Sequence, residues 1–293
     1  MDVGNESGTR LLVNKEESYM LRTCWLHKLR SPEVTAYLSS GDVILVPVGA
    51  TEQHGPHLPL SVDTDWAVAA CEGAAELSGV VVAPPIHYGW SPHHMGYAGT
   101  VTLGADTLRQ VVFDVCASLI CHGFHHVVIV NGNRIANLQP LEIAAVQLQN
   151  KTGARVAVVD TGLIARTEIK SICEADDGGL EHAGEAETSF AMYRRFSDVD
   201  PAAVTSRTVN ADSGEFTYPV VLDPSDNRNA VSLFETPSSY RESVGSFGYS
   251  GNPTLASPEK GKAMADAISM NLAKFLKEFA TLEVAEVNAE VPT

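Results

Sequence analysis

Residues 43–70 read VILVPVGATEQHGPHLPLSVDTDWAVAA, and this stretch decides the fold. It opens with six apolar residues, Val43–Val48, that show no polar alternation. Such a run is typical of a strand that is covered on both faces. A turn rich in glycine, proline and polar residues follows, and helical periodicity then extends over 64–78. A buried strand followed by a helix is the unit from which parallel sheets are built.

The alternation of strand and helix continues along the chain. Further strands are predicted at 80–83, 127–130 and 155–159, and further helices at 106–122, 138–151, 185–196 and 258–279. This order predicts an α/β fold with a mostly parallel sheet that helices cover on both faces. We expect a flexible N-terminal arm at 1–18, one α/β domain at 19–280 and an acidic tail at 281–293. Residues 197–257 have weak periodicity, and their interpretation as an insertion, a lid or an oligomer contact stays open.

Composition excludes several classes of function. The 293 residues include 20 basic and 36 acidic ones, for a net charge of −16, so a nucleic-acid-binding face is not expected. No apolar run reaches the roughly 18 residues that cross a bilayer, so no membrane contact is expected. The polar first 17 residues lack the pattern of a signal peptide. The five cysteines include no CxxC pair, which favours reduced thiols in a cytoplasmic protein.

Candidate ligands for a metal ion follow the first strand. Parallel sheets bind ligands beyond the carboxyl ends of their strands, where Glu52, His54 and Asp63 are expected. Imidazole and carboxylate together suit divalent Zn, Mn or Fe, and one carboxylate can bridge two such ions. The alternative is structural: Glu52 would cap one helix, Asp63 would cap the next, and His54 would pack on a proline.

A second polar cluster lies at the predicted start of the helix at 185–196. Residues 181–189 read EHAGEAETS and contain Glu181, His182 and Glu187. A histidine beside carboxylates can be held in one tautomer and move protons near neutral pH. The alternative is that the acids only stabilise the positive end of the helix dipole.

Three blocks of this sequence resemble the creatininase (creatinine amidohydrolase) family. The first is VPVGATEQHGPHLPL at 46–60 followed by Asp63, the second runs from YGWS at 88–91 to GTVTL at 99–103, and the third from EHAG at 181–184 to ETS at 187–189. The resemblance implies a three-layer α/β/α subunit with a mostly parallel central sheet. It also implies a homo-oligomer, commonly a hexamer, with one or two divalent metal ions in each subunit.

The resemblance also implies roles for individual residues. Glu52, His54 and Asp63 would be metal ligands, with Asp63 as the bridge between two ions. His182, with Glu181 beside it, would be the proton shuttle, and Glu187 would be a further acid or ligand. Substrate contacts are expected from the middle block and from the end of the third strand, namely Tyr88, Trp90, Ser91, His93, Gly99, Thr100 and Arg134.

One position departs from the family pattern. The family reads Asn-Gly-His after its third strand, and the histidine is a metal ligand, whereas this chain has Asn133 there. An amide oxygen is a weaker, neutral ligand, so one metal site would be weakened, lost or completed by a replacement ligand from His93 or His94. Arg134 adds a positive charge that could hold a substrate carboxylate or enolate oxygen, or pair with a nearby acid.

These features predict a metal-dependent hydrolase that acts on a small polar cyclic or amide substrate through a metal-activated water. One alternative is a hydrolase that opens the ring of a cyclic ketone such as 3-dehydro-scyllo-inosose by breaking a C–C bond. The other is a non-catalytic, oligomeric binding or scaffold protein, an alternative that the substitution at position 133 motivates.

Overall fold

The sheet is parallel and has four strands in the part of the chain that the structure describes. The computed structural model describes residues 21–134, 136–175, 178–205 and 234–288. The strands have the spatial order β2-β1-β3-β4. Their bounds are Val43–Val48 for β1, Val81–Val82 for β2, His126–Asn131 for β3 and Arg155–Asp160 for β4. The predicted parallel sheet is therefore confirmed.

Helices surround the sheet. They are α1 (Ser31–Leu38), α2 (Val62–Ser78), α3 (Ala105–Cys121), α4 (Leu138–Thr152), α5 (Thr161–Ile164), α6 (Arg166–Ile172), α7 (Glu185–Arg195), α8 (Pro237–Val244) and α9 (Pro258–Phe279). The five predicted helices correspond to α2, α3, α4, α7 and α9, with ends that differ by two residues at most. The short helices α1, α5, α6 and α8 were not predicted.

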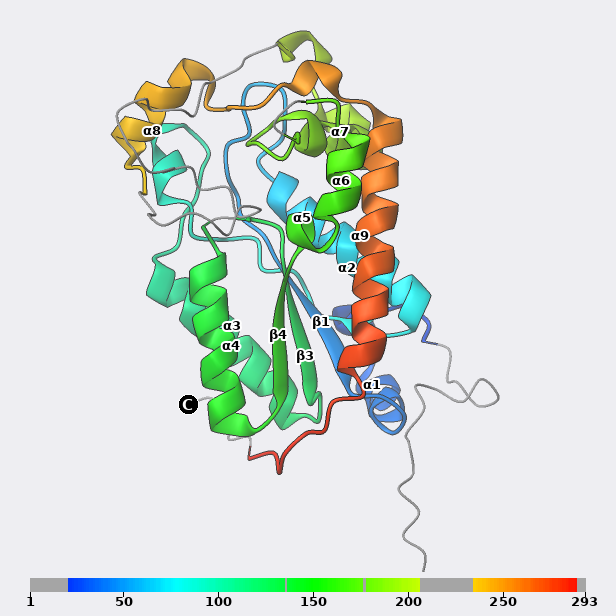
Figure 1. The fold of residues 1–293 in the computed structure, drawn as a ribbon. Coiled ribbons are helices and arrows are strands. Elements are labelled where there is room, and N and C mark those ends of the chain that lie inside the picture. Colours follow the sequence, from blue (N-terminus) through cyan, green and yellow to red (C-terminus); the bar gives the residue numbers. More distant parts are fainter. Residues whose placement is uncertain (1–20, 135, 176–177, 206–233, 289–293) are drawn as a thin grey trace, which may run out of the picture.

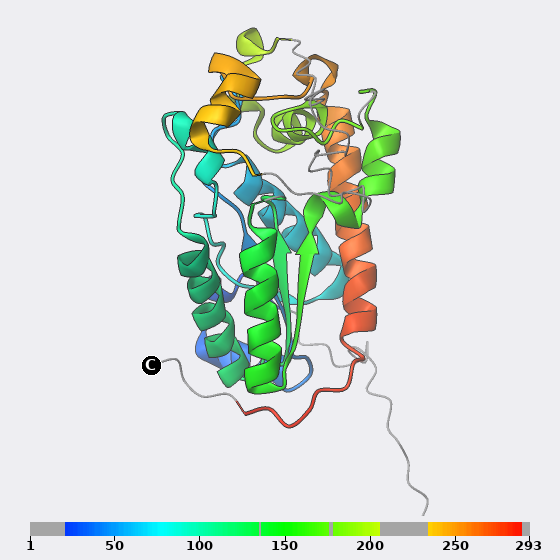
Figure 2. The ribbon, with the colours of Figure 1, turned by 60° about the vertical axis from the view of Figure 1, so that its left-hand side comes forward.

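Alternate residues of each strand face different helical layers, which explains why the strands are apolar throughout. Leu45 of β1 and Val128 of β3 belong to the core shared with α2, α7 and α9. Their neighbours Ile44 and Ile129 belong to the core shared with α3 and α4. Figures 1 and 2 show these two layers on opposite sides of the sheet. The chain therefore forms the predicted three-layer α/β/α fold.

Close packing of α9 on α7 fixes the segment that precedes α7. Helix α9 begins at Pro258, and Ser257 caps it by accepting a hydrogen bond from the backbone N–H of Lys260. Gly261 lies so close to α7 that a Cβ there would be 2.0 Å from the carbonyl oxygen of Ser189. Lys260 also pairs with the buried carboxylate of Glu185 at the start of α7. These contacts position the 181–187 segment at the end of the sheet.

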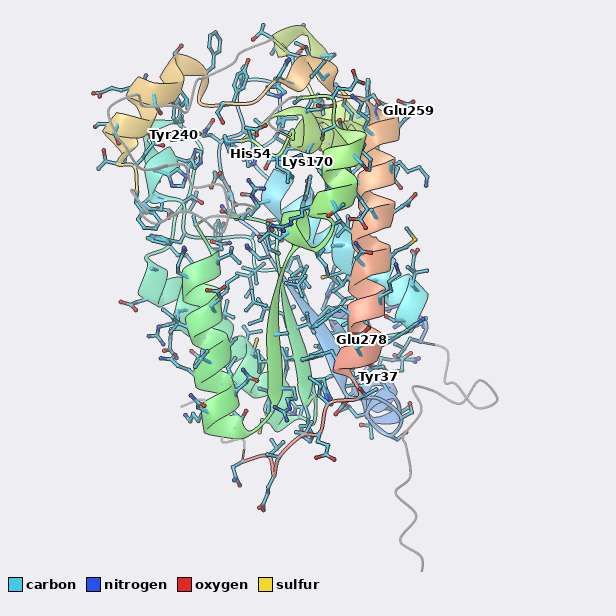
Figure 3. The ribbon with its side chains drawn as sticks, viewed as in Figure 1. Tyr37, His54, Lys170, Tyr240, Glu259 and Glu278 are labelled. Carbon is cyan, nitrogen blue, oxygen red and sulfur yellow. The ribbon has the colours of Figure 1, made fainter. Side chains whose placement is uncertain are left out.

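Two glycines let the start of α2 touch the ends of two strands. A Cβ on Gly49, directly after β1, would lie 2.4 Å from the backbone nitrogen of Thr64. A Cβ on Gly132, directly after β3, would lie 1.9 Å from the carbonyl oxygen of Asp63. The first turn of α2 is thereby held against the carboxyl ends of β1 and β3. Figure 3 labels His54 at this end of the molecule and Tyr37 at the opposite end.

The C-terminal segment packs against the opposite end of the sheet, where the strands begin. The ring of His126, the first residue of β3, lies 2.9 Å from the Asp42 carboxylate through Nδ1 and 3.0 Å from the Leu282 carbonyl oxygen through Nε2. The backbone N–H of Asn288 donates to the carbonyl of Thr152. The predicted arm at 1–18 and the last five residues of the predicted tail lie outside the described residues. Among the described helices, none has the length and apolarity to cross a membrane.

We predict that Gly132→Ala disrupts the contact between β3 and α2. The added methyl would overlap the backbone of Asp63, so we expect a loss of roughly 3 kcal/mol and a fall in Tm of roughly 6–12 °C. Differential scanning calorimetry measures the change. The matched control is Gly41→Ala, whose methyl would meet only the Tyr37 ring at 3.5 Å. Equal Tm values for the two variants would contradict the prediction.

We predict that the Asp42–His126 pair stabilises the fold more at low pH. Burial lowers the pKa of His126, but the hydrogen bond and charge of Asp42 outweigh it and raise that pKa above its ordinary value. This contribution is present in full below pH 6.5 and is lost as the pH rises through the folded-state pKa. Tm measured from pH 5.5 to 8.5 should therefore fall less steeply in Asp42→Asn than in the wild type. Parallel curves would exclude the pair as the source.

Candidate metal centre

The turn after β1 is fixed by backbone hydrogen bonds. The N–H of Glu52 donates to the carbonyl of Leu60 at 3.0 Å, and the N–H of Gln53 donates to Oγ1 of Thr100 at 3.0 Å. Thr100, predicted to contact substrate, is buried and supports this turn. The turn places the side chains of Glu52 and His54 at the carboxyl edge of the sheet, where the sequence predicted them.

His54 turns an unpaired ring nitrogen toward two carboxylates. Its Nδ1–H donates to the carbonyl of Glu52 at 3.0 Å, so Nε2 is the nitrogen that can take up a proton or bind a cation. That atom lies 3.3 Å from Oδ1 of Asp63 and 3.6 Å from Oε2 of Glu187. It is buried and has no hydrogen-bond partner among the described residues. The interpretation of Asp63 as a helix cap is wrong, since α2 begins at Val62 and Ser61 is the cap residue.

This surrounding requires a positive charge at Nε2 of His54. Burial lowers the pKa of the imidazole, but the carboxylates of Asp63 and Glu187 outweigh it and raise that pKa to about 10. In the absence of a metal ion, a proton on Nε2 would supply this charge. A divalent ion would use the same lone pair and the same carboxylate oxygens, and imidazole with carboxylate is a donor set that Zn and Mn accept. The residues therefore fit a metal ion.

His182 is held in one tautomer by the turn after β1. Its Nε2–H donates to the carbonyl of Gln53 at 2.7 Å, so Nδ1 has the lone pair and lies 3.6 Å from Oε1 of Glu52. Burial and the nearby His54 lower the pKa of His182 well below its ordinary value. Ala183 beside it has a φ of +51°, an unusual conformation for a residue other than glycine. A neutral imidazole thus faces the carboxylates with a free lone pair.

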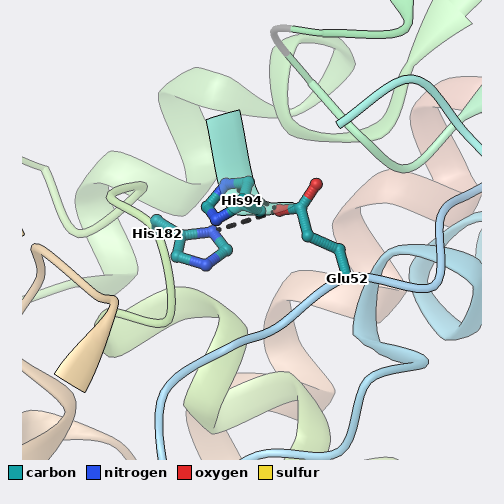
Figure 4. A group of neighbouring side chains, drawn as sticks. All are labelled: Glu52, His94 and His182. Carbon is teal, nitrogen blue, oxygen red and sulfur yellow. Dashed lines mark ion pairs between the residues drawn. The ribbon is translucent and has the colours of Figure 1, made fainter. Parts of the chain in front are cut away.

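Glu52 is surrounded by polar side chains. Its Oε2 accepts a hydrogen bond from Nδ2 of Asn133 at 2.8 Å, and its Oε1 lies 3.0 Å from Nε2 of His94. Figure 4 shows the rings of His94 and His182 turned toward this carboxylate. Burial and the charge of Asp63 raise the pKa of Glu52 to about 8.

Three sets of side chains have ligand atoms close enough together to hold a metal ion. In each set, one ligand atom from every residue lies within 4.8 Å of the others. The sets are Glu52, His54 and Asp63; His54, His182 and Glu187; and Glu52, His94 and His182. The structure thus brings together Glu52, His54, Asp63, His182 and Glu187, and it places the Asn133 amide beside Glu52 and Asp63, whereas Glu181 belongs to none of the sets.

The other predicted site residues are more widely spread. Ser91 is buried with its Oγ 3.1 Å from Nδ2 of Asn133, and His93 packs edge-on against Tyr240. Tyr88 and Gly99 are exposed, and Trp90 is half-buried. Arg134 donates to the Leu180 carbonyl, and the Glu181 carbonyl accepts from the Gly184 N–H. Their substrate and shuttle roles stay predictions.

Gln53 and the segment around α8 are parts of the centre that sequence analysis missed. The Gln53 amide nitrogen lies 2.7 Å from Nδ1 of His94 and donates to the Gly248 carbonyl at 2.6 Å. Tyr240 of α8 packs edge-on against His94 at 4.6 Å. Gln53 lies between two predicted ligands, which is a signal that could have found it. Gly248 and Tyr240 come from the region at 197–257 whose role the sequence left open.

Comparison with known proteins gives consistent results. The family model described as creatinine amidohydrolase matches residues 27–276. A mycofactocin precursor peptide peptidase of Mycobacterium ulcerans is 32% identical over 254 residues, which cover 84% of this chain and 88% of that protein. A 3-dehydro-scyllo-inosose hydrolase of Thermotoga maritima is 27% identical, covering 84% and 80%. The solved structure titled "Creatininase Mn" has a TM-score of 0.69 at 25% identity, covering 88% and 99%.

We predict that Glu187→Gln separates stability from metal binding. Burial raises the pKa of Glu187, so its charged form is unfavourable in the folded protein, and the metal-free variant should melt a few degrees above the wild type, while added Mn²⁺ or Zn²⁺ should raise its Tm less. Thermal melts with and without the ion measure both effects. Glu278→Gln makes the same charge change at the opposite end of the molecule and should leave the metal-induced rise intact. An unchanged rise in Glu187→Gln would contradict the prediction.

Proposed function

The chain belongs to the creatininase family, whose members are hydrolases, and on this premise we propose that it is a metal-dependent amidohydrolase. The observation that carries the metal requirement is the buried, unpartnered Nε2 of His54 between the carboxylates of Asp63 and Glu187. The residues that would hold an ion are His54 and its partners in the convergent sets, namely Glu52 and Asp63 on one side and His182 and Glu187 on the other. A bound divalent ion would acidify a water molecule and polarise a carbonyl group.

His182 is suited to move a proton during hydrolysis. Its Nδ1 lone pair faces the centre, and the hydrogen bond from Nε2 to the Gln53 carbonyl prevents the ring from turning away. Because its pKa is held low, the imidazole is neutral at pH 7 and can accept the proton of the attacking water. The same nitrogen can then deliver that proton to the leaving nitrogen of the amide. This assignment uses His182 as a base and then as an acid.

We propose that the protein cleaves an amide bond in a small substrate. A mycofactocin precursor peptide peptidase is among the relatives that support this choice, and the family model is named for an amidohydrolase. Arg134, beside the third strand's end, is proposed to bind a carboxylate of the substrate. A homo-oligomer is a further proposal that rests on the family resemblance, and a cytoplasmic location is one that rests on the cysteine pattern.

The two alternatives from the sequence receive less support. Ring opening of a cyclic ketone rests on a relative of 27% identity. A non-catalytic scaffold rests on the substitution at Asn133, whereas His54 and His182 keep the tautomers that ligation and proton transfer need. We therefore prefer cleavage of a C–N bond.

We predict that His182→Gln lowers turnover by about 10²–10⁴-fold without loss of the metal ion. The assay incubates protein loaded with Mn²⁺ or Zn²⁺ with creatinine, short peptides and a cyclic ketone, and detects newly released amine or carboxylate. His122→Gln is the matched control, since His122 is exposed beyond the end of α3. Full activity in His182→Gln would remove its assigned role. Wild-type protein that binds no ion would overturn the proposed function.

A further inference from the structure

The amide of Asn133 fills the space between two carboxylates. Its Nδ2 lies 2.8 Å from Oε2 of Glu52 and 3.2 Å from Oδ2 of Asp63. An amide nitrogen has two hydrogens to donate and no lone pair for a metal ion. The side chain therefore offers these carboxylates hydrogen bonds from a partly positive group at a position where the family pattern has a histidine ligand.

The position of Asn133 is fixed by its neighbour two residues earlier. The backbone N–H of Asn133 donates to Oδ1 of Asn131 at 3.2 Å, and Nδ2 of Asn131 donates back to the Asn133 carbonyl at 2.7 Å. Nδ2 of Asn131 also donates to Asp160 at the end of β4. Because these groups are buried, a rotation of the Asn133 amide would have to leave two carboxylates without their donor.

The second oxygen of Glu52 faces a proton as well. The Gln53 amide nitrogen points at Nδ1 of His94, so the ring proton of His94 is on Nε2, the atom 3.0 Å from Oε1 of Glu52. The orientation of Gln53 is set because its nitrogen donates to the Gly248 carbonyl and its Oε1 accepts from the N–H of Gly55. His94 is thus arranged as a donor to Glu52 and not as a metal ligand.

His54 has the opposite arrangement. Its Nε2 lone pair faces Oδ1 of Asp63 and Oε2 of Glu187, so that three acceptors meet with no donor among them unless His54 is protonated. Oδ2 of Asp63 therefore accepts a hydrogen bond from Asn133, whereas Oδ1 lies in a position that suits a cation. The two halves of the centre differ in chemistry.

We propose that this centre holds one divalent ion, bound at Nε2 of His54 on the side that faces Oδ1 of Asp63 and Oε2 of Glu187, and that the Asn133 amide takes the place of a second ion between Glu52 and Asp63. The inference rests on the proposed metal-dependent function and adds the number of ions and the residue that sets it. Glu52 would then act as a positioning residue, held between Asn133 and His94, and Asp63 would offer the ion its Oδ1, because Asn133 donates to its Oδ2.

The number of bound ions tests the proposal. Full-length protein is loaded with Mn²⁺ or Zn²⁺, dialysed, and analysed by mass spectrometry for metal content per chain. We expect one ion in the wild type and two in Asn133→His, because the histidine replaces a donor by a lone pair. Asn133→Asp, which has nearly the same shape, also loses the donor and should gain the second ion, so the test survives if the histidine variant does not fold.

Two further variants separate the possible outcomes. Asn150→His adds a histidine on the exposed face of α4, far from the centre, and should keep one ion. His94→Gln should also keep one ion. Two ions in the wild type, with loss of one in His94→Gln, would overturn the inference and make His94 a ligand while the proposed function stands. No ion in the wild type or in either Asn133 variant would overturn both.

Discussion

Three carboxylates surround the imidazole of His54, and the rest of the centre is arranged around this crowding. Glu52, Asp63 and Glu187 come from three separate elements, so only the folded chain brings their charges together. Burying like charges in a poorly polarisable surrounding is unfavourable unless donors or cations compensate them. The packing of apolar strands between two helical layers provides the stability that allows such a site to exist.

A single turn sets the tautomers of both key histidines. The carbonyl of Glu52 accepts a hydrogen bond from Nδ1–H of His54, and the carbonyl of Gln53 accepts one from Nε2–H of His182. Consecutive backbone groups therefore decide which nitrogen of each ring faces the centre. This dependence explains why the conformation of the turn matters as much as its side chains, and why glycines must let α2 pack directly against the strand ends.

The sequence predicted the sheet and the long helices because their signals are local. Val43–Val48 is apolar without interruption, and α9 matches its predicted bounds because Pro258 and Ser257 mark its start. Helices α1, α5, α6 and α8 are eight residues long or shorter, too short for a clear period. Glu52, His54 and Asp63 were found because one segment contains them. His94 was considered only as a replacement ligand, since its contact with Glu52 depends on tertiary folding.

The hydrogen bond from Gln53 to Gly248 connects the segment around α8 to the side chains of the centre. Tyr240 and Gly248 belong to a segment far along the chain from the strand that supplies Glu52. Displacing the Gly248 carbonyl would take away the acceptor that orients the Gln53 amide, and that amide in turn orients the ring of His94. A molecule that enters from this side and shifts the segment would thereby change the hydrogen bonding of a carboxylate that it never touches.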